Sequence, residues 1–172
     1  MPRNPQPARR LTPGPPPTYP PALDEVDLAL VRVLQSDARR SVAALAREVG
    51  LAESTCAGRV RALSERGIVR RYVADIDPAA VGLGVEAMVA LRLTGHVRDR
   101  VDSLRDDLAG VPGVIAIYNT SGADDFLIHV ATATTQALRD FVLDHVASRP
   151  GVSHTETSLL FEATRGVGPL PR

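Results

Sequence analysis

The sequence SVAALAREVGLAESTCAGRVRALSERGIV, residues 41–69, contains two short amphipathic helix patterns joined by a tight turn. Ser41 is a typical N-cap residue, and apolar residues such as Leu45 and Val49 recur after it at helical spacing. Gly50 ends the first pattern, because glycine adopts the left-handed conformation of a helix C-terminus at little cost. A helix, a turn and a second helix in this order are typical of a helix-turn-helix DNA-binding motif.

The second predicted helix has an apolar face and a polar face. At about 100° per residue, Cys56, Val60 and Leu63 lie on one side. The other side carries hydroxyl groups, bare backbone and guanidinium groups, which can approach a DNA groove and bind base edges or phosphates. With the cap of the first helix included, the candidate DNA-binding residues are Ser41, Ser54, Thr55, Gly58, Arg59 and Arg61. Arg59 lies nearer the apolar face, so an ion pair within the fold is almost as good an interpretation of it.

A helical hairpin with a solvated arginine face is the alternative interpretation, since charged outer faces are common on surface helices. Three features favour DNA binding. A further helix, capped by Asp24, is predicted before the motif, the connecting loops are short, and Arg70 and Arg71 follow directly. Residues 69–76 alternate and are rich in β-branched side chains, which predicts a strand that Asp77-Pro78 ends.

The formal net charge is zero, yet the charges are unevenly distributed along the chain. Residues 1–21 hold three Arg and no acidic residue, residues 22–72 nine Arg and seven acidic residues, and residues 73–172 eight Arg and thirteen acidic residues. A basic N-terminal part beside an acidic C-terminal part is expected when only one of them binds nucleic-acid phosphates. The distribution therefore favours double-stranded DNA as a partner of the first part.

The amino-acid composition also limits which classes of protein this chain can belong to. Residues 1–21 hold nine of the fourteen prolines and little that is apolar, which predicts a disordered basic arm. The chain has no apolar run of about 18 residues and no signal-peptide pattern, so we expect a cytoplasmic protein with no membrane partner. The single cysteine, Cys56, cannot form an internal disulfide and is expected to pack as a small apolar side chain.

From Val85 onward, the apolar period changes from that of a helix to that of a strand. The predicted elements are a strand over 85–93, a helix around 101–108, strands over 114–120 and 126–131 flanking a turn at 121–124, a helix from about 135, and a strand over 152–162. This β-α-β-β-α-β order predicts a ferredoxin-like fold, in which helices cover one face of an antiparallel sheet.

The other face of that sheet is predicted to be apolar and uncovered. We assign to it Met88, Ala90, Ile115, Ile117, Leu127 and Ala131, or their neighbours in the other register. An apolar face of this kind must be buried against a partner, most simply a second copy of the chain.

With both parts in view, the chain resembles the leucine-responsive regulator and asparagine regulator family of bacterial and archaeal transcription factors. The resemblance runs from about residue 23 to residue 162 and rests on several short motifs taken together. These motifs are Leu23-Asp24-x-x-Asp27, Gly50-Leu51, Arg59-Val60-Arg61-x-Leu63, Gly67-Ile68 and Ser121-Gly122-x-x-Asp125-Phe126-Leu127. The resemblance implies a sequence-specific regulator that forms dimers, which assemble further into tetramers, octamers or other rings.

The resemblance also implies a small-molecule effector, often an amino acid, that binds between dimers near the glycine-aspartate turn. At that turn, the N–H groups of Ser121 and Gly122 can bind a carboxylate, and Asp125 can pair with an ammonium group. Thr155 and Thr157 share one face of the last strand and can add hydroxyl groups from a neighbouring chain. Ordinary hairpin and strand roles are the alternative for all five residues.

Three residues depart from the family pattern. Ala52 stands where the family often has a helix-capping serine, and Gly58 lies within a helix at a cost of about 1 kcal/mol relative to alanine. Ala123 stands where relatives often carry a longer polar residue, which leaves the side-chain preference for the effector open.

No pattern of catalytic or metal-binding residues stands out. The four histidines have no metal-ligand spacing, and His154-Thr155-Glu156 lacks the C-x-x-C that a zinc deaminase requires. We therefore expect no catalytic residue, no metal site and no cofactor. Two alternatives remain: a sirohaem decarboxylase-like enzyme, which resembles the family in both domains, and an architectural DNA-binding protein without a ligand.

The sequence thus predicts an α+β protein with two domains. The first is a helix-turn-helix domain of winged-helix-like form, and the second is a ferredoxin-like βαββαβ domain. The predicted segments are a disordered arm at 1–21, the DNA-binding domain at 22–68, a linker strand and loop at 69–84, an effector-binding and oligomerisation domain at 85–163, and a C-terminal tail at 164–172.

Overall fold

The computed structural model of the chain describes residues 23–95, 98–164, 166 and 168–170. The predicted disordered arm at 1–21 lies outside these residues. The chain divides into two compact units. The helical unit extends to Val73 and also includes the residues from Gly166 onward, and the sheet unit comprises residues 74–165. The amino-acid sequence contains no pattern that predicts this grouping of the last residues with the helical unit.

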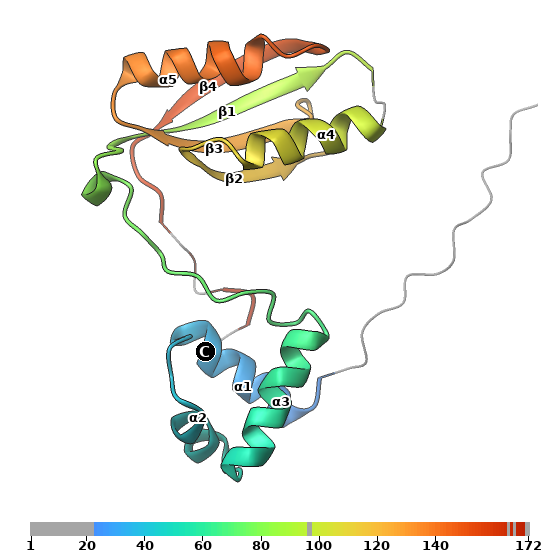
Figure 1. The fold of residues 1–172 in the computed structure, drawn as a ribbon, viewed down its shortest axis with the longest axis vertical. Coiled ribbons are helices and arrows are strands. Elements are labelled where there is room, and N and C mark those ends of the chain that lie inside the picture. The colour runs from blue at the N-terminus through green and yellow to red at the C-terminus, as the bar shows by residue number, and fades with distance from the viewer. Residues whose placement is uncertain (1–22, 96–97, 165, 167, 171–172) are drawn as a thin grey trace, which may run out of the picture. The chain divides into compact units, whose positions relative to one another are not determined.

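Three helices form the helical unit: α1 (Glu25–Ser36), α2 (Val42–Val49) and α3 (Glu53–Glu65), labelled in Figure 1. The Asp24 carboxylate caps α1 by accepting a hydrogen bond from the Asp27 N–H at 2.7 Å. The Ser41 hydroxyl caps α2 by accepting one from the Ala44 N–H at 3.2 Å. Gly50 ends α2 with a φ of 69°, a left-handed conformation that favours glycine. These predicted helix boundaries are confirmed.

The three helices enclose a small apolar core. Fully buried side chains from each helix meet there, namely Leu30, Leu45, Cys56 and Leu63. The predicted apolar face of α3 is thus confirmed, with Val60 partly buried beside the core. Burial raises the pKa of the Cys56 thiol, because the thiolate would lose its hydration. That thiol therefore acts as an apolar packing group.

The predicted strand at 69–76 is absent from the structure. Residues 70–77 form no helix or strand, and Tyr72, Val73 and Ile76 are at least half exposed. A strand needs a neighbour for its backbone hydrogen bonds, and one chain offers none to this segment. The described residues of the helical unit likewise contain no strand.

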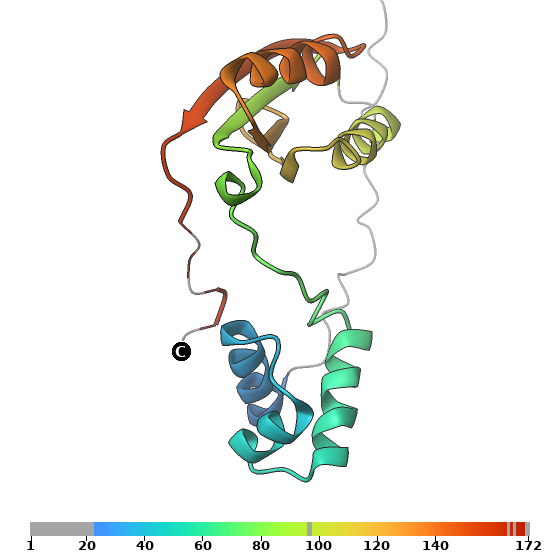
Figure 2. The same cartoon turned by 60° about the vertical axis from the view of Figure 1, so that its left-hand side comes forward.

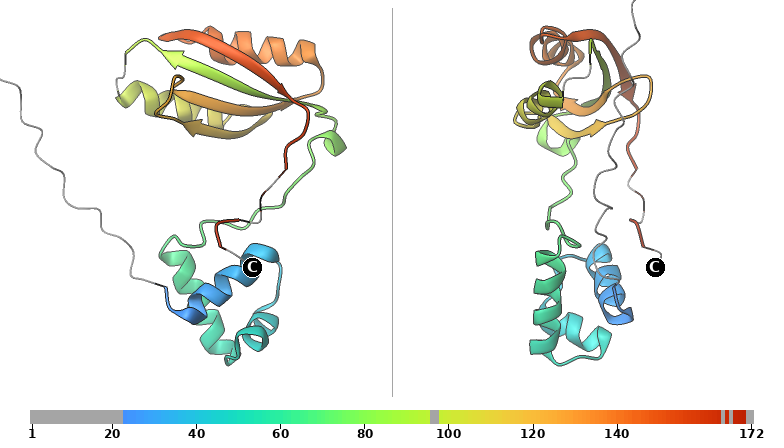
Figure 3. Two further views of the ribbon diagram at one scale, coloured as in Figure 1. Left: turned by 180° about the vertical axis from the view of Figure 1, so that it is seen from behind. Right: turned by 90° about the vertical axis from the view of Figure 1, so that its right-hand side faces the viewer.

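The sheet unit contains four strands: β1 (Val85–Leu93), β2 (Val114–Asn119), β3 (Phe126–Thr132) and β4 (Val152–Leu160). Helix α4 (Arg98–Ala109) follows β1, and α5 (Thr135–Phe141) follows β3 and continues as a π-helical segment, Val142–Ala147. The strands are all antiparallel, in the order β2-β3-β1-β4. Both helices lie on one face of the sheet, as Figures 2 and 3 show. The predicted α+β class and ferredoxin-like order are confirmed.

The core of this unit lies between the sheet and its helices. Alternate β1 residues Ala87, Val89 and Leu91 are fully buried on the helix side. The intervening Met88 and Ala90 therefore lie on the uncovered face, where Ala90 pairs with Leu127. Ile117, also assigned to that face, packs against the core instead. The reason is an irregularity in the β2–β3 pairing between Val114 and Ala116, which changes the alternation.

Among the described residues, no helix is long and apolar enough to cross a membrane.

Candidate DNA-binding face and effector site

The outer face of α3 presents four of the predicted DNA-binding residues to solvent. Ser54, Thr55, Gly58 and Arg61 are all exposed. Within the described part of the chain, the side chains of Ser54, Thr55 and Arg61 make no hydrogen bond or ion pair. A Cβ atom built on Gly58 would meet nothing within 4 Å, so the fold does not require glycine there. This face is polar and sterically open.

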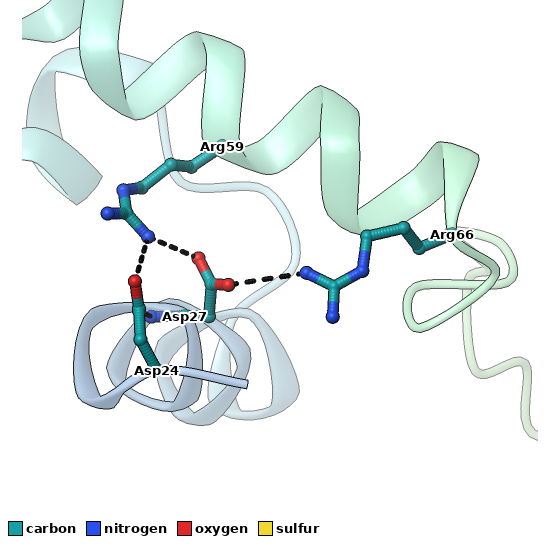
Figure 4. Close-up of polar contacts among 4 residues, drawn as sticks. All are labelled: Asp24, Asp27, Arg59 and Arg66. Atoms are coloured by element: carbon teal, nitrogen blue, oxygen red, sulfur yellow. Dashed lines mark hydrogen bonds and ion pairs between the residues drawn. The ribbon is translucent and has the colours of Figure 1, made fainter. Parts of the chain in front are cut away.

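Arg59 lies on a different side of α3 and is engaged by acidic residues of α1 (Figure 4). Its Nη1 donates to Asp24 Oδ2 at 2.6 Å and to Asp27 Oδ1 at 2.8 Å. Arg66, which follows α3, lies with its Nη1 3.4 Å from Asp27 Oδ2. We call these four residues the α1–α3 ion-pair cluster. The ion pair left open as an alternative for Arg59 is thus present.

The hydrogen bonds of this cluster favour the charged forms of Asp24 and Arg59. A hydrogen bond from the Asp27 N–H, and then one from Arg59, lower the pKa of the Asp24 carboxyl from its ordinary value. Hydrogen bonds to Asp24 and then to Asp27 raise the pKa of the Arg59 guanidinium. The Asp27 side chain is only 11% exposed, so its charge depends on these arginines for compensation. The cluster therefore fixes the orientation of α3 against α1.

The remaining DNA-binding candidate is Ser41, at the start of α2. Ser41 is exposed, and its hydroxyl is used by the helix cap. Nearby, Arg40 forms an ion pair with Glu48, which ties the segment before α2 to the end of that helix.

The predicted effector turn connects β2 and β3. Ser121 and Gly122 are exposed at its tip. Asp125 is half-buried, and its Oδ2 accepts a hydrogen bond from the Leu93 N–H at 2.7 Å. The Asp125 N–H donates to the Leu91 carbonyl at 2.9 Å. The alternative role, in which Asp125 holds the hairpin in place, is therefore present whether or not a ligand binds.

One residue of this turn region was missed. Arg92 of β1 donates through Nε to the Ala123 carbonyl at 2.7 Å, and its Nη2 lies 3.5 Å from Asp124 Oδ1. These contacts join residues 31 and 32 positions apart. The alternation of β1 indicated that Arg92 faces away from the core, but no local pattern identifies its partners.

Thr155 and Thr157 lie on β4, at the edge of the sheet. They pair with Leu91 and Val89 of β1, respectively. Because β1 separates β3 from β4, the strands that carry Asp125 and the threonines are about 10 Å apart. A single chain therefore does not bring the hairpin and the threonines into one continuous site.

Thr157 instead lines an open groove between α5 and β4. The groove has a volume of about 280 Å³, and its other lining residues are Thr135, Leu138, Arg139, Val142 and Leu143. It is mostly apolar, with a guanidinium and two hydroxyl groups at its border. Of these residues, only Thr157 was predicted from the sequence to be part of a site. Within the described part of the chain, no group of three His, Cys, Asp or Glu residues is arranged to hold a metal ion.

Two protein-family models match the chain, one for each unit. The AsnC-type helix-turn-helix domain matches residues 23–64, and the Lrp/AsnC ligand binding domain matches residues 86–166. The first match covers α1, α2 and most of α3, and the second begins in β1 and extends past β4.

Curated proteins and solved structures with similar sequences cover nearly the same range. The HTH-type transcriptional regulator AldR of Mycolicibacterium smegmatis is 44% identical over 148 residues, which are 86% of this chain and 86% of that protein. The crystal structure of MtbAldR is 40% identical, with a TM-score of 0.72, and the match covers 86% of this chain and 100% of that one. Transcriptional regulator NMB0573 of Neisseria meningitidis, solved as a complex with L-Met, is 28% identical, with a TM-score of 0.74 and coverage of 87% and 97%.

Proposed function

Because the chain belongs to the Lrp/AsnC family of transcriptional regulators, we propose that the exposed face of α3 contacts DNA and that the sheet unit binds an amino acid which changes DNA binding or assembly. The chain is an AsnC-type DNA-binding transcriptional regulator with a ligand-binding domain. It is a regulator rather than an enzyme, so the sirohaem decarboxylase alternative is excluded.

The DNA-contact proposal is carried by the contrast between the arginines of α3. Arg59 is held by the carboxylates of Asp24 and Asp27, whereas Arg61 is exposed and has no partner among the described residues. A guanidinium without a partner keeps all its donors for a guanine edge or a phosphate. Ser54 and Thr55 lie one to two turns before Arg61 and add hydroxyl donors toward the N-terminus of the same helix.

The effector proposal places an amino acid at the β2–β3 turn. Exposed N–H groups around Ser121 and Gly122 bind the carboxylate, and the negative charge of Asp125 attracts the ammonium group. Thr155 and Thr157 contribute from a neighbouring chain, because within one chain they lie across β1 from the turn. Support comes from NMB0573, a structurally similar regulator that was solved with L-Met.

Assembly into dimers is part of the proposal, since several apolar surfaces lack cover in a single chain. Tyr72, Val73 and Ile76 are at least half exposed on a segment, residues 70–77, that forms no helix or strand. Tyr118, on β2 of the uncovered sheet face, is 51% exposed. A two-fold dimer buries such surfaces and presents two copies of α3 to a pseudo-palindromic DNA site. Tetramers or octamers follow from joining dimers at the effector site.

Fluorescence anisotropy tests the proposed function with labelled DNA from upstream of the protein's own gene and scrambled DNA of equal length. We expect tighter binding to the upstream DNA and a change in affinity on addition of at least one common amino acid. Light scattering on the same samples reports the assembly state. Equal affinity for both DNAs at every salt concentration contradicts the DNA-contact proposal. A response to no amino acid, with DNA preference intact, contradicts only the effector proposal and favours an architectural protein.

A further inference from the structure

Gln35, in the last turn of α1, makes a two-point contact with the C-terminal segment of the chain. Its side-chain Nε2 donates to the Leu170 carbonyl at 2.9 Å, and its Oε1 accepts from the Leu170 N–H at 3.2 Å. One amide group thus satisfies both backbone polar groups of one residue, in the way that a neighbouring strand would. Leu170 itself is half-buried.

Gly168 adds a second, independent feature to this contact. Its φ of 95° lies in the region that side chains rarely adopt. A Cβ atom at this position would come within 2.5 Å of Gln35 Cδ and 2.7 Å of Gln35 Oε1. The backbone of Gly168 therefore packs directly on the Gln35 side chain because no side chain intervenes.

From these contacts we propose that the Gln35 end of α1 is a docking site for the chain's own C-terminal segment, Gly168–Leu170. The sheet unit is then joined to the helical unit by two chain connections, one after Val73 and one before Gly166. Figures 1 and 2 show this segment, in red, beside the end of α1.

The docking site lies on the helix that also positions α3. Helix α1 carries Asp27, which pairs with Arg59 and Arg66, and Asp24 precedes its first turn. The C-terminal segment follows β4, the strand that carries Thr155 and Thr157. A change at β4 can therefore reach α1 through the C-terminal segment and its two hydrogen bonds with Gln35, without passing through the linker at 74–84.

Amide hydrogen exchange on the full-length protein, resolved to single residues by fragmentation mass spectrometry, tests the contact directly. The comparison uses the wild type, Gln35→Ala, Gly168→Ala and a synthetic peptide of residues 162–172. We expect the Leu170 amide of the wild type to exchange about 10-fold more slowly than in the peptide, since the contact supplies two hydrogen bonds. Both variants should exchange at the rate of the peptide.

Gln136→Ala is the matched control, because Gln136 is an exposed glutamine on α5 whose side chain donates a hydrogen bond to Asp140, on the same helix. It should leave the Leu170 amide protected. Exchange of the wild-type Leu170 amide at the peptide rate overturns the proposal, as does full protection in Gln35→Ala. The measurement needs neither DNA nor an effector, so its outcome is separate from that of the proposed function.

Discussion

Replacing Arg61 and Arg59 separately by alanine distinguishes a DNA contact from a structural ion pair on the same helix. Arg61 is exposed and makes no hydrogen bond or ion pair in the described part of the structure, so its removal breaks no polar interaction within the fold. Arg59 donates to Asp24 and Asp27, and its removal leaves the nearly buried Asp27 with Arg66 alone, at 3.4 Å. The two variants remove the same charge and the same number of atoms.

The structure sets opposite expectations for the two variants. Arg61→Ala should weaken binding to the specific site by about 1–3 kcal/mol, or roughly 5- to 150-fold, if Arg61 contacts a guanine edge. Its effect on unfolding should stay within about 0.5 kcal/mol, as for a surface substitution. Arg59→Ala should lower the thermal midpoint of the helical unit, because a carboxylate that is nearly buried loses its shorter ion pair.

The assay is anisotropy with specific and scrambled DNA over a range of salt concentrations, beside thermal unfolding followed by circular dichroism. If Arg61 contacts a phosphate instead of a base, both DNAs should lose affinity alike, and the slope of log K against log salt should shrink by about 0.9. Arg32→Ala is the control, since Arg32 is an exposed arginine of α1 outside the ion-pair cluster. Its affinity for the specific site should remain near that of the wild type.

Two results would refute the reasoning. If Arg61→Ala binds both DNAs as the wild type does, α3 does not contact DNA through this residue. If Arg59→Ala unfolds at the wild-type temperature yet loses specific binding, the cluster does not fix α3, and Arg59 is the DNA contact instead.

Three further predictions concern single positions. Gly58→Ala should stabilise the helical unit by about 0.5–1 kcal/mol in thermal unfolding, because the new methyl group meets no atom of the fold. The same variant should weaken DNA binding in anisotropy, because the methyl group keeps the α3 backbone away from the DNA groove. An unchanged affinity for DNA would contradict a close approach of this backbone to the groove. The lowered pKa of Asp24 stabilises the folded state above the unfolded value of about 3.9, and this contribution is lost as pH falls through the folded value. The wild-type midpoint should therefore fall more steeply below about pH 4 than that of Asp24→Asn, and parallel curves would exclude this role. Asp125→Ala should abolish the amino-acid response in anisotropy while ligand-free DNA binding stays near the wild-type value, and a retained response would remove Asp125 from the site.

Features that depend on a residue and its immediate neighbours could be predicted from the sequence. The caps by Asp24 and Ser41 and the left-handed Gly50 follow from local hydrogen bonding and backbone sterics, which are the same in a short segment as in the whole fold. The alternation of β1 likewise indicated its buried face, because side chains of a strand point to opposite sides in turn.

Features that depend on how distant segments meet could not be predicted in this way. The sequence placed Arg59 near the apolar face but could not choose its partners, Asp24 and Asp27, which lie 35 and 32 positions away. Residues 69–76 have the composition of a strand, yet strand formation requires a second segment to share backbone hydrogen bonds, and the single chain provides none.

Helix α3 shows most clearly the difference between what the sequence determines and what the tertiary structure decides. The residue types and spacing of α3 by themselves determined a helix with a polar outer face, and together with the uneven charge along the chain they favoured DNA as its partner. Only the tertiary structure decided that Arg61 stays exposed, that Arg59 is paired, and that Gln35 contacts Leu170 across 135 positions. The local conformation of the backbone depends mainly on each residue and its neighbours. The partner of a side chain depends on how all the intervening elements pack.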